Sequence, residues 1–178
     1  MASDRASFLE FLIDRSYCTA YNMLPVEETG LPLYAKGEFF SRDERYWLSK
    51  SIPIWGNEKN ELVYVFAADS FDTETVGRCI DYALADGLPK VKPHKEHQYT
   101  NIKTVFVADA FDTETQKYIK KKSFSKSYKF SLHGFSTLKA AAVDLSNEKT
   151  VTNSAGYELE AYFKRLFAAW KKSMAADR

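Results

Sequence analysis

The chain has 178 residues, of which 45% are hydrophobic and 28% are charged. These values are ordinary for a globular protein and exclude a disordered or coiled-coil chain, and the length fits one domain with its own core. The formal net charge is only +1, which argues against a uniformly basic nucleic-acid-binding protein.

Residues 4–67 predict one helix followed by three strands. The apolar residues of 4–24 recur at helical spacing, and Asp4 or Ser7 is the expected N-cap. Three strands are expected after this helix, with a turn over 41–43 between the first two: 31–40, 44–55 and 62–67. The third is apolar on both faces, which places it in the middle of the sheet.

A sequence repeat follows. Val65–Thr75 recurs 40 residues later as Val105–Thr115, with differences at two positions. In each copy a buried strand leads into a helix whose expected N-cap is Asp72 or Asp112. Two such units in succession predict two parallel strands joined by a crossover helix.

The last third of the chain predicts three more strands between two helices. The helices are expected over 113–122 and 156–175, and the strands over 128–132, 138–145 and 150–153. No linker-like stretch divides the chain. Residues 1–178 are therefore predicted to form a single α/β domain, with a mixed sheet flanked by helices in the order α-βββ-α-β-α-βββ-α.

The N-terminal residues and the two cysteines predict a soluble, cytoplasmic protein. Glu10 and Asp14 interrupt the first apolar stretch, so it is not a signal-peptide core. No apolar run approaches the ~18 residues of a membrane-spanning helix. Cys18 and Cys79 fall in predicted helices without a close partner, which favours buried hydrophobic residues over a disulfide or zinc site. The sequence indicates no cofactor and no membrane partner.

The order α-β-β-β-α-β over the first part of the chain resembles the core of restriction-endonuclease-like nucleases. That resemblance implies a degenerate metal site in which Asp43 or Glu44 acts with Lys50, and to which His94 and His97 could contribute. The third strand departs from the family pattern, because no lysine stands two places after Glu61. A hydrolytic enzyme of this class is therefore an alternative hypothesis, and the pattern leans against it.

Two further features have a structural and a functional interpretation. Lys50 would face inward in a strict strand, which can mark a site, but Pro53 indicates an edge or bulge that breaks the alternation. Asp69 and Asp109 end two neighbouring strands at the edge where ligands usually bind in open α/β sheets. The repeated block around them favours a role in starting the following helices.

His94, Glu96 and His97 form a His-x-x-His pair with an adjacent acid. Such a pair could contribute to a metal site, but a third ligand is missing at a recognisable spacing and His133 is far away in sequence. The pattern favours a proline-bounded basic loop that also contains Lys92, and it assigns no metal.

The charge is unevenly distributed along the chain. Residues 1–86 contain 15 acidic and 8 basic side chains (net −7), whereas residues 87–178 contain 9 and 17 (net +8). The segment 117–130 has six lysines, four aromatic residues and no acid. Lysines beside stackable rings suit a phosphate backbone or single-stranded nucleic acid, and the lack of arginine indicates no sequence-specific recognition. The candidate residues are Lys121, Lys122, Lys126 and Lys129.

Two other interpretations of this charge pattern remain open. The lysines fit an ordinary solvated helix end and loop, which the pattern slightly favours. The acidic half could also receive the basic half of a second molecule, which would give a homodimer.

Five short blocks resemble a family of uncharacterised bacterial proteins, a domain of unknown function about as long as this chain: 43–50, 91–97, 126–130, 143–145 and 152–156. The resemblance brings no activity with it, but it implies one shared site formed by Arg45, Lys50, Lys92, His94, Glu96 and His97. The leading hypothesis is a binding module that uses a lysine- and aromatic-rich face for an anionic or protein partner, and the sequence leans against an enzyme but leaves that question open.

Overall fold

The computed structural model describes residues 2–43 and 57–176. Within them the chain forms four α-helices, two short 3-10 helices and seven strands. In chain order these are α1 (Ala2–Ser16), β1 (Asn22–Leu24), β2 (Leu33–Asp43), β3 (Asn57–Ala67), α2 (Thr73–Gly87), η1 (Leu88–Lys90), β4 (His97–Ala108), α3 (Thr113–Lys121), β5 (Ser125–Ser127), β6 (Phe135–Asp144), β7 (Lys149–Thr152), η2 (Ser154–Gly156) and α4 (Glu158–Ala176).

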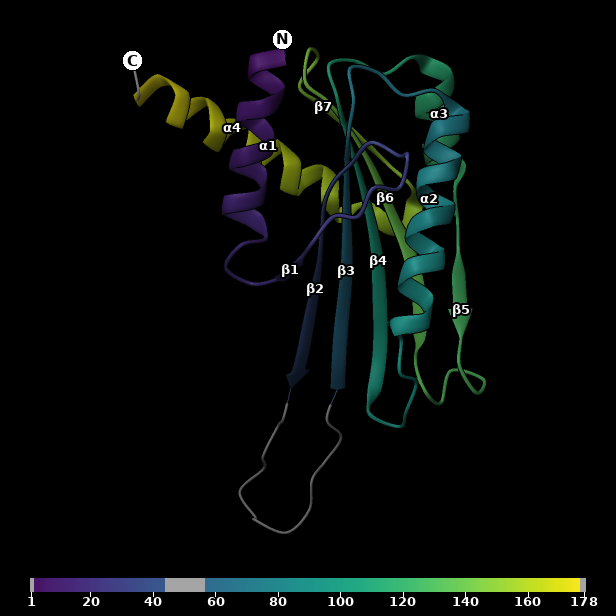
Figure 1. Ribbon diagram of the computed structural model, residues 1–178. Coiled ribbons are helices and arrows are strands. Elements are labelled where there is room, and N and C mark those ends of the chain that lie inside the picture. Colours follow the sequence, from purple (N-terminus) through teal and green to yellow (C-terminus); the bar gives the residue numbers. More distant parts are fainter. Residues whose placement is uncertain (1, 44–56, 177–178) are drawn as a thin grey trace.

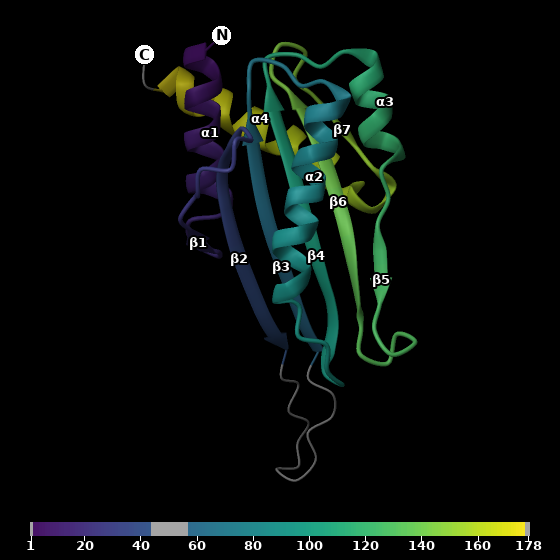
Figure 2. The same cartoon turned by 45° about the vertical axis from the view of Figure 1, so that its right-hand side comes forward.

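The strands form one mixed sheet in the order β1-β2-β3-β4-β6-β5, with β7 also paired to β6. The three central strands β3, β4 and β6 are parallel, whereas β1, β2, β5 and β7 pair antiparallel with their neighbours. Helices α2 and α3 lie on one face, and α1 and α4 on the other (Figures 1 and 2). The predicted mixed α/β fold is therefore confirmed, including the parallel pairing of the strands that end at Ala67 and Ala108.

Each face of the sheet has its own hydrophobic core. On the α2 and α3 face, the stacked rings of Phe66 and Phe106 lie 5.3 Å apart, and Phe71 meets Phe106 edge-on. On the α1 and α4 face, Phe8 stacks on Phe167 at 5.1 Å over the buried valines of β3 and β4. Successive side chains of β3 and β4 point to opposite faces and are apolar on both, so each strand contributes to both cores.

The N-caps of α2 and α3 follow the sequence prediction, whereas the cap expected at Asp4 or Ser7 is wrong because both residues lie inside α1, which begins at Ala2. The Asp72 carboxylate accepts a hydrogen bond from the Thr75 amide at 2.7 Å, and Asp112 accepts one from the Thr115 amide at 2.6 Å. The backbone amides that a helix N-terminus leaves unpaired are satisfied in this way.

The N-terminal third corrects three predicted boundaries. The helix expected over 4–24 ends at Ser16, because residues 22–24 pair as β1 with β2. The turn expected over 41–43 is wrong, because these residues continue β2 and pair with the start of β3, which begins at Asn57. The strand expected over 44–55 lies outside the described residues. Cys79 is buried as expected, but Cys18 is exposed in the turn after α1.

The strand expected over 128–132 is also wrong. β5 occupies residues 125–127, and residues 128–134 form the loop between β5 and β6. The alternating apolar side chains of this stretch suggested a strand with a buried face. Instead Phe130 is 98% exposed and Leu132 is 75% exposed.

In the part of the chain that the structure describes, no helix is both long and apolar enough to cross a lipid bilayer.

Candidate binding surface

The lysine- and aromatic-rich segment lies along one edge of the sheet. Lys121 ends α3, Lys122 follows it, Lys126 lies in the edge strand β5, and Lys129 lies in the β5–β6 loop. We call this surface, from Lys117 to Leu132, the β5 edge. Its loop lies at the end of the sheet opposite to the two chain termini (Figure 1).

The lysines of the β5 edge have no acidic partner in the part of the chain that the structure describes. Among the residues that the structure describes, no carboxylate forms an ion pair with any of them: Lys117, Lys120, Lys121, Lys122, Lys126 and Lys129. Elsewhere in the molecule, lysines such as Lys90 and Lys103 pair with glutamate or aspartate at 3.0 Å or less. Two of the edge lysines lie over rings instead, Lys122 over Tyr118 at 4.3 Å and Lys126 over Tyr128 at 5.5 Å.

The β5–β6 loop has a strained backbone that holds its apolar tip in solvent. Lys129, Phe130 and Ser131 have φ angles of 47°, 55° and 68°, a left-handed conformation that costs roughly 1–2 kcal/mol for each residue with a side chain. Local hydrogen bonds keep the turn closed, among them Tyr128 N to Gly134 O at 3.0 Å and His133 N to Tyr128 O at 3.1 Å. Such strain persists where the surroundings fix the backbone.

Contacts with His97 hold the backbone of this loop in place. Its Nδ1 donates to the His133 carbonyl at 2.8 Å, its Nε2 accepts from the Thr100 hydroxyl at 2.9 Å, and its ring lies 6.0 Å from the Tyr128 ring. A carbonyl oxygen only accepts hydrogen bonds, so Nδ1 carries the proton. At Gly134 a Cβ would lie 2.5 Å from the His97 carbonyl oxygen, so this position requires glycine. The buried His97 is therefore an anchor of the loop.

Asn153 anchors the other end of the β5 edge. Its Nδ2 donates to the carbonyls of Lys122 and Leu138, both at 3.0 Å, and its Oδ1 accepts from the amides of Ala140 and Gly156. The side chain is buried and uses all four of its expected hydrogen-bonding positions. It therefore fixes the chain that leaves α3 against β6.

The other predicted site residues divide into two groups. His94, Glu96 and His97 lie together at the start of β4, with the two histidine rings 6.3 Å apart. His94 Nε2 contacts the Glu58 carboxylate at 2.5 Å, and the Glu96 amide donates to His94 Nδ1 at 3.2 Å. Lys92 is exposed nearby on the wall of a shallow pocket with Glu58.

Arg45, Lys50 and Glu44 lie outside the described residues, as does the side chain of Asp43. Among the described residues, no group of three histidine, cysteine or acidic side chains is arranged to hold a metal ion. Both ring nitrogens of His94 and of His97 already contact protein groups.

Asp69 and Asp109 do not cap the helices that follow them, which corrects the favoured interpretation. The caps are Asp72 and Asp112, three residues further on. The Arg5 guanidinium instead joins the two carboxylates, with Nη1 donating to Asp109 at 2.9 Å and Nη2 to Asp69. No sequence pattern signals this contact, because Asp69 and Asp109 lie 64 and 104 residues after Arg5 in the chain.

A second polar cluster was not predicted either. Glu61 on β3 accepts hydrogen bonds from Lys103 of the neighbouring strand, at 2.5 Å, and from the Tyr21 hydroxyl. Burial alone would raise the pKa of Glu61, but the Lys103 ammonium and the hydrogen bonds of the cluster hold it below its usual value. Burial and the Glu61 charge raise the pKa of Tyr21 far above its usual value. Lys103 thus lies beside Glu61 but comes from β4, whereas the nuclease pattern requires a lysine on the same strand as the acid.

Comparison with known proteins identifies the family. No significant match to the chain was found among curated proteins or among solved structures. A family model described as "Domain of unknown function (DUF8052)" matches residues 7–165, which include the whole β5 edge and both of its anchors. The chain therefore belongs to this family of unknown function, as the resemblance of its short blocks implied.

Proposed function

We propose that this protein is a binding module for single-stranded nucleic acid and that the β5 edge is its contact surface. The observation that carries the proposal is the set of lysines without a described acidic partner along an edge whose terminal loop presents an almost fully exposed Phe130. This proposal implies a cytoplasmic location, where such ligands are found.

The lysines suit a phosphate backbone. Six ammonium groups within fourteen residues have no described carboxylate to pair with, and a polyanion that binds them releases its own counterions. β5 is also the outer strand of the sheet, so its free side presents backbone amides together with exposed serine hydroxyls at 125 and 127. These groups can donate further hydrogen bonds to phosphate oxygens.

The exposed ring supports a single-stranded ligand over a duplex. Phe130 offers a face on which an unpaired base can stack, and such stacking is sequence-tolerant because every base has a π-face. In a duplex the base faces are already stacked on one another. The surface has no arginine between residues 117 and 132, so the proposed binding is non-specific in sequence.

The strained loop supports a binding role for the ring. Three consecutive left-handed residues cost free energy, and Phe130 gains no compensating burial from that conformation. His97 and Gly134 hold this conformation, although the tip of the loop is exposed to solvent. A partner that covers Phe130 would recover part of this cost.

The experiment is a fluorescence anisotropy titration of a labelled oligodeoxythymidylate at about 50 mM salt. The double variant Lys126→Gln/Lys129→Gln should weaken binding by at least about tenfold, since two phosphate contacts are lost. Phe130→Ala should weaken it by roughly 1–3 kcal/mol, the contribution of one base stacked on one ring.

The matched control is Lys164→Gln/Lys172→Gln, which removes the same charge from exposed positions on α4. It should leave the affinity nearly unchanged. Equal losses in the two double variants would mean that the overall charge binds and the β5 edge does not. If the oligonucleotide fails to bind while anionic phospholipid vesicles bind in a Phe130-dependent manner, the surface is a membrane contact and the proposal is wrong.

A further inference from the structure

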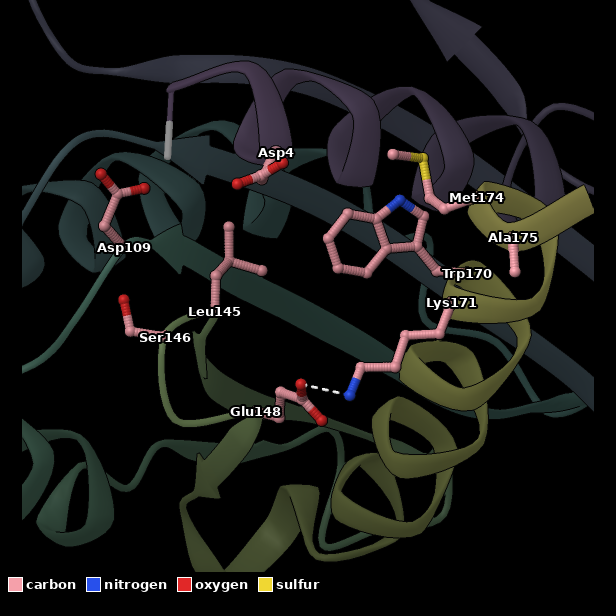
Figure 3. Close-up of a pocket in the computed structure, with 9 residues that line it drawn as sticks. All are labelled: Asp4, Asp109, Leu145, Ser146, Glu148, Trp170, Lys171, Met174 and Ala175. Carbon is pink, nitrogen blue, oxygen red and sulfur yellow. Dashed lines mark ion pairs between the residues drawn. The ribbon is translucent and has the colours of Figure 1, made fainter. Parts of the chain in front are cut away.

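A cavity of about 510 Å³ lies close to the two chain termini, where α1, α4 and the turns that follow β4 and β6 meet (Figure 3). The charged side chains on its walls already have partners. Asp109 pairs with Arg5, Glu148 pairs with Lys171, and Asp4 also has an interaction partner. Among the described residues, this cavity therefore presents no unpaired charge to a ligand.

Another pocket, of about 470 Å³, lies at the opposite end of the sheet, where β2 ends and β3 begins (Figure 1). Its walls come from these two strands and from the segment that follows α2. The volume falls in the range of small-molecule sites. We call it the Asn60 pocket, and the residues that line it are Glu38, Phe40, Glu58, Asn60, Lys90 and Lys92.

Asn60 has hydrogen-bonding capacity that the protein does not use. Its side chain is only 5% exposed, and its Oδ1 has no hydrogen-bond partner in the part of the chain that the structure describes. The buried Asn153, by contrast, uses all of its hydrogen-bonding positions. A buried polar atom without a partner costs free energy. A ligand in the pocket that donates a hydrogen bond to Asn60 would remove this cost.

An exposed aromatic ring lies next to Asn60. Phe40 is directly opposite Asn60 in the antiparallel pairing of β2 and β3, so the two side chains lie on the same face of the sheet. The Phe40 side chain is 54% exposed. A flat ligand can therefore stack on the Phe40 ring while its edge meets the Asn60 amide.

Two of the charged side chains in the Asn60 pocket pair with each other. Lys90 Nζ lies 2.9 Å from the Glu38 carboxylate and 3.0 Å from the Asp86 carboxylate. Burial alone would lower the pKa of Lys90, but these two carboxylates raise it, so the ammonium stays charged. Lys92 is exposed, and no described carboxylate pairs with it. Lys92 therefore remains as a hydrogen-bond donor for a ligand.

Glu58 is held in place as a hydrogen-bond acceptor. His94 Nδ1 accepts from the Glu96 amide at 3.2 Å, so Nε2 carries the proton and donates to the Glu58 carboxylate at 2.5 Å. A carboxylate can accept about four hydrogen bonds, and the Glu58 side chain is 27% exposed. It can therefore accept further hydrogen bonds from a ligand.

We propose that the Asn60 pocket binds guanine, either in a free nucleotide or as a base of a nucleic-acid strand. Guanine has two adjacent donors, the N1–H group and the N2 amino group, which one carboxylate such as Glu58 can accept together. The second hydrogen of the N2 amino group is then available to the unpartnered Oδ1 of Asn60. The O6 and N7 atoms of guanine are acceptors that lysine contacts, here Lys92, and Phe40 supplies a stacking face.

The same arrangement discriminates against the other purine. Adenine has an acceptor at N1 and a hydrogen at C2, so its edge gives neither Glu58 nor Asn60 a donor at these positions. A site that is built to accept hydrogen bonds rejects an analogue that lacks the donors. The pocket would therefore add a base preference that the β5 edge does not provide. The β5–β6 loop lies at the same end of the sheet (Figure 1), so one strand could reach both surfaces.

The test uses the monophosphates of guanosine, inosine and adenosine, which share the sugar phosphate and differ in the base. Inosine lacks only the 2-amino group of guanosine. Isothermal titration of the full-length chain should give saturable binding of guanosine monophosphate with a Kd below about 1 mM. Inosine monophosphate should bind roughly tenfold more weakly, and adenosine monophosphate at least as weakly as inosine monophosphate.

Two variants test the assignment of the 2-amino group. Glu58→Gln and Asn60→Leu should each remove most of the preference for guanosine over inosine monophosphate, because each removes an acceptor of the N2 hydrogens. Asn60→Leu keeps a similar volume and removes a buried unpaired atom, so the free energy of unfolding should not fall. Glu58 is partly exposed, so Glu58→Gln reports on the ligand even if Asn60→Leu fails to fold.

A matched pair of lysine variants provides the control. Lys92→Gln should weaken binding of guanosine monophosphate roughly tenfold. Lys95→Gln removes the same charge from an exposed position outside the pocket lining and should bind like the unmodified chain. The proposal is overturned if guanosine monophosphate shows no saturable binding, if adenosine or inosine monophosphate binds equally well, or if both Glu58→Gln and Asn60→Leu retain the preference.

Oligodeoxythymidylates with and without one central guanine distinguish the two sources of the base. Tighter binding of the guanine-containing strand, lost in Asn60→Leu, would show that the pocket takes a base of the strand. Equal binding of both strands, together with intact binding of guanosine monophosphate, would assign the pocket to a free nucleotide. The mononucleotide titration does not involve the β5 edge, so failure of the nucleic-acid proposal and failure of the guanine site give different results.

Discussion

At the scale of single residues, most of the contacts that the sequence pattern does not predict are made by buried polar side chains. The sequence pattern makes His97 a candidate metal ligand, whereas in the structure it anchors a loop by contacting the His133 carbonyl, 36 residues further along the chain. Glu61 was considered only as an acid without its lysine, and Lys103 meets it from the next strand. Both roles depend on contacts between distant segments, which residue spacing along one chain cannot reveal.

Glu61 makes a prediction about pH. Its pKa is lowered in the folded state, so its stabilising contribution is complete above its usual value near 4.5 and is lost as the pH falls through the folded pKa. Glu61→Gln should therefore lower the free energy of unfolding by roughly 1–3 kcal/mol at neutral pH. This difference from the unmodified protein should shrink as the pH falls below about 4.5, because the carboxyl of the unfolded chain takes up a proton there and the native carboxyl does so only at a lower pH.

Urea unfolding of both proteins at several pH values checks this prediction. A difference that stays constant down to pH 3 would show that the carboxylate charge of Glu61 does not contribute.

At the scale of elements, the sequence predicted what is encoded locally. The strand-to-helix units around Asp72 and Asp112 were predicted well, because caps, buried strands and helical stripes are signals within about ten residues. The end of α1 was not, since β1 forms only by pairing with β2. The apolar side chains of 128–132 alternate as they would in a strand. This stretch forms an exposed loop instead, because its conformation depends on contacts with His97 and on Gly134.

Asp112 allows a direct test at this scale. Its carboxylate accepts hydrogen bonds from both the amide and the hydroxyl of Thr115. Asp112→Ala should therefore lower the free energy of unfolding by about 1 kcal/mol, whereas Asp112→Asn should retain most of it, because asparagine is an equally good N-cap. Chemical denaturation of the two variants decides the question. Equal losses would indicate that the negative charge at the start of α3 matters and the hydrogen bond does not.

At the scale of the whole molecule, the strands of the two halves of the sequence separate in space. The strand order β1-β2-β3-β4-β6-β5 places the strands of the acidic first half on one side of the sheet and those of the basic second half on the other. The near-zero net charge therefore conceals a polarised molecule. Composition predicted the basic segment, but its position on an open edge, with lysines that pair with no described carboxylate and with an exposed ring, follows from the fold.

The cavity near the chain termini and the β5–β6 loop lie at opposite ends of the sheet (Figure 1). The sequence indicated the carboxyl edge through Asp69 and Asp109, but not the cavity there, because its walls come from both ends of the chain. No local pattern brings Asp4 and Trp170 together.

The salt dependence of oligonucleotide binding tests the central claim most directly. If about four lysines of the β5 edge contact phosphates, the logarithm of the association constant should fall with the logarithm of the salt concentration with a slope of about −3. The Lys126→Gln/Lys129→Gln variant should give a shallower slope, and Lys164→Gln/Lys172→Gln an unchanged one. Absence of binding at low salt, or a slope near zero for the unmodified protein, would contradict the assignment of the β5 edge as a nucleic-acid-binding surface.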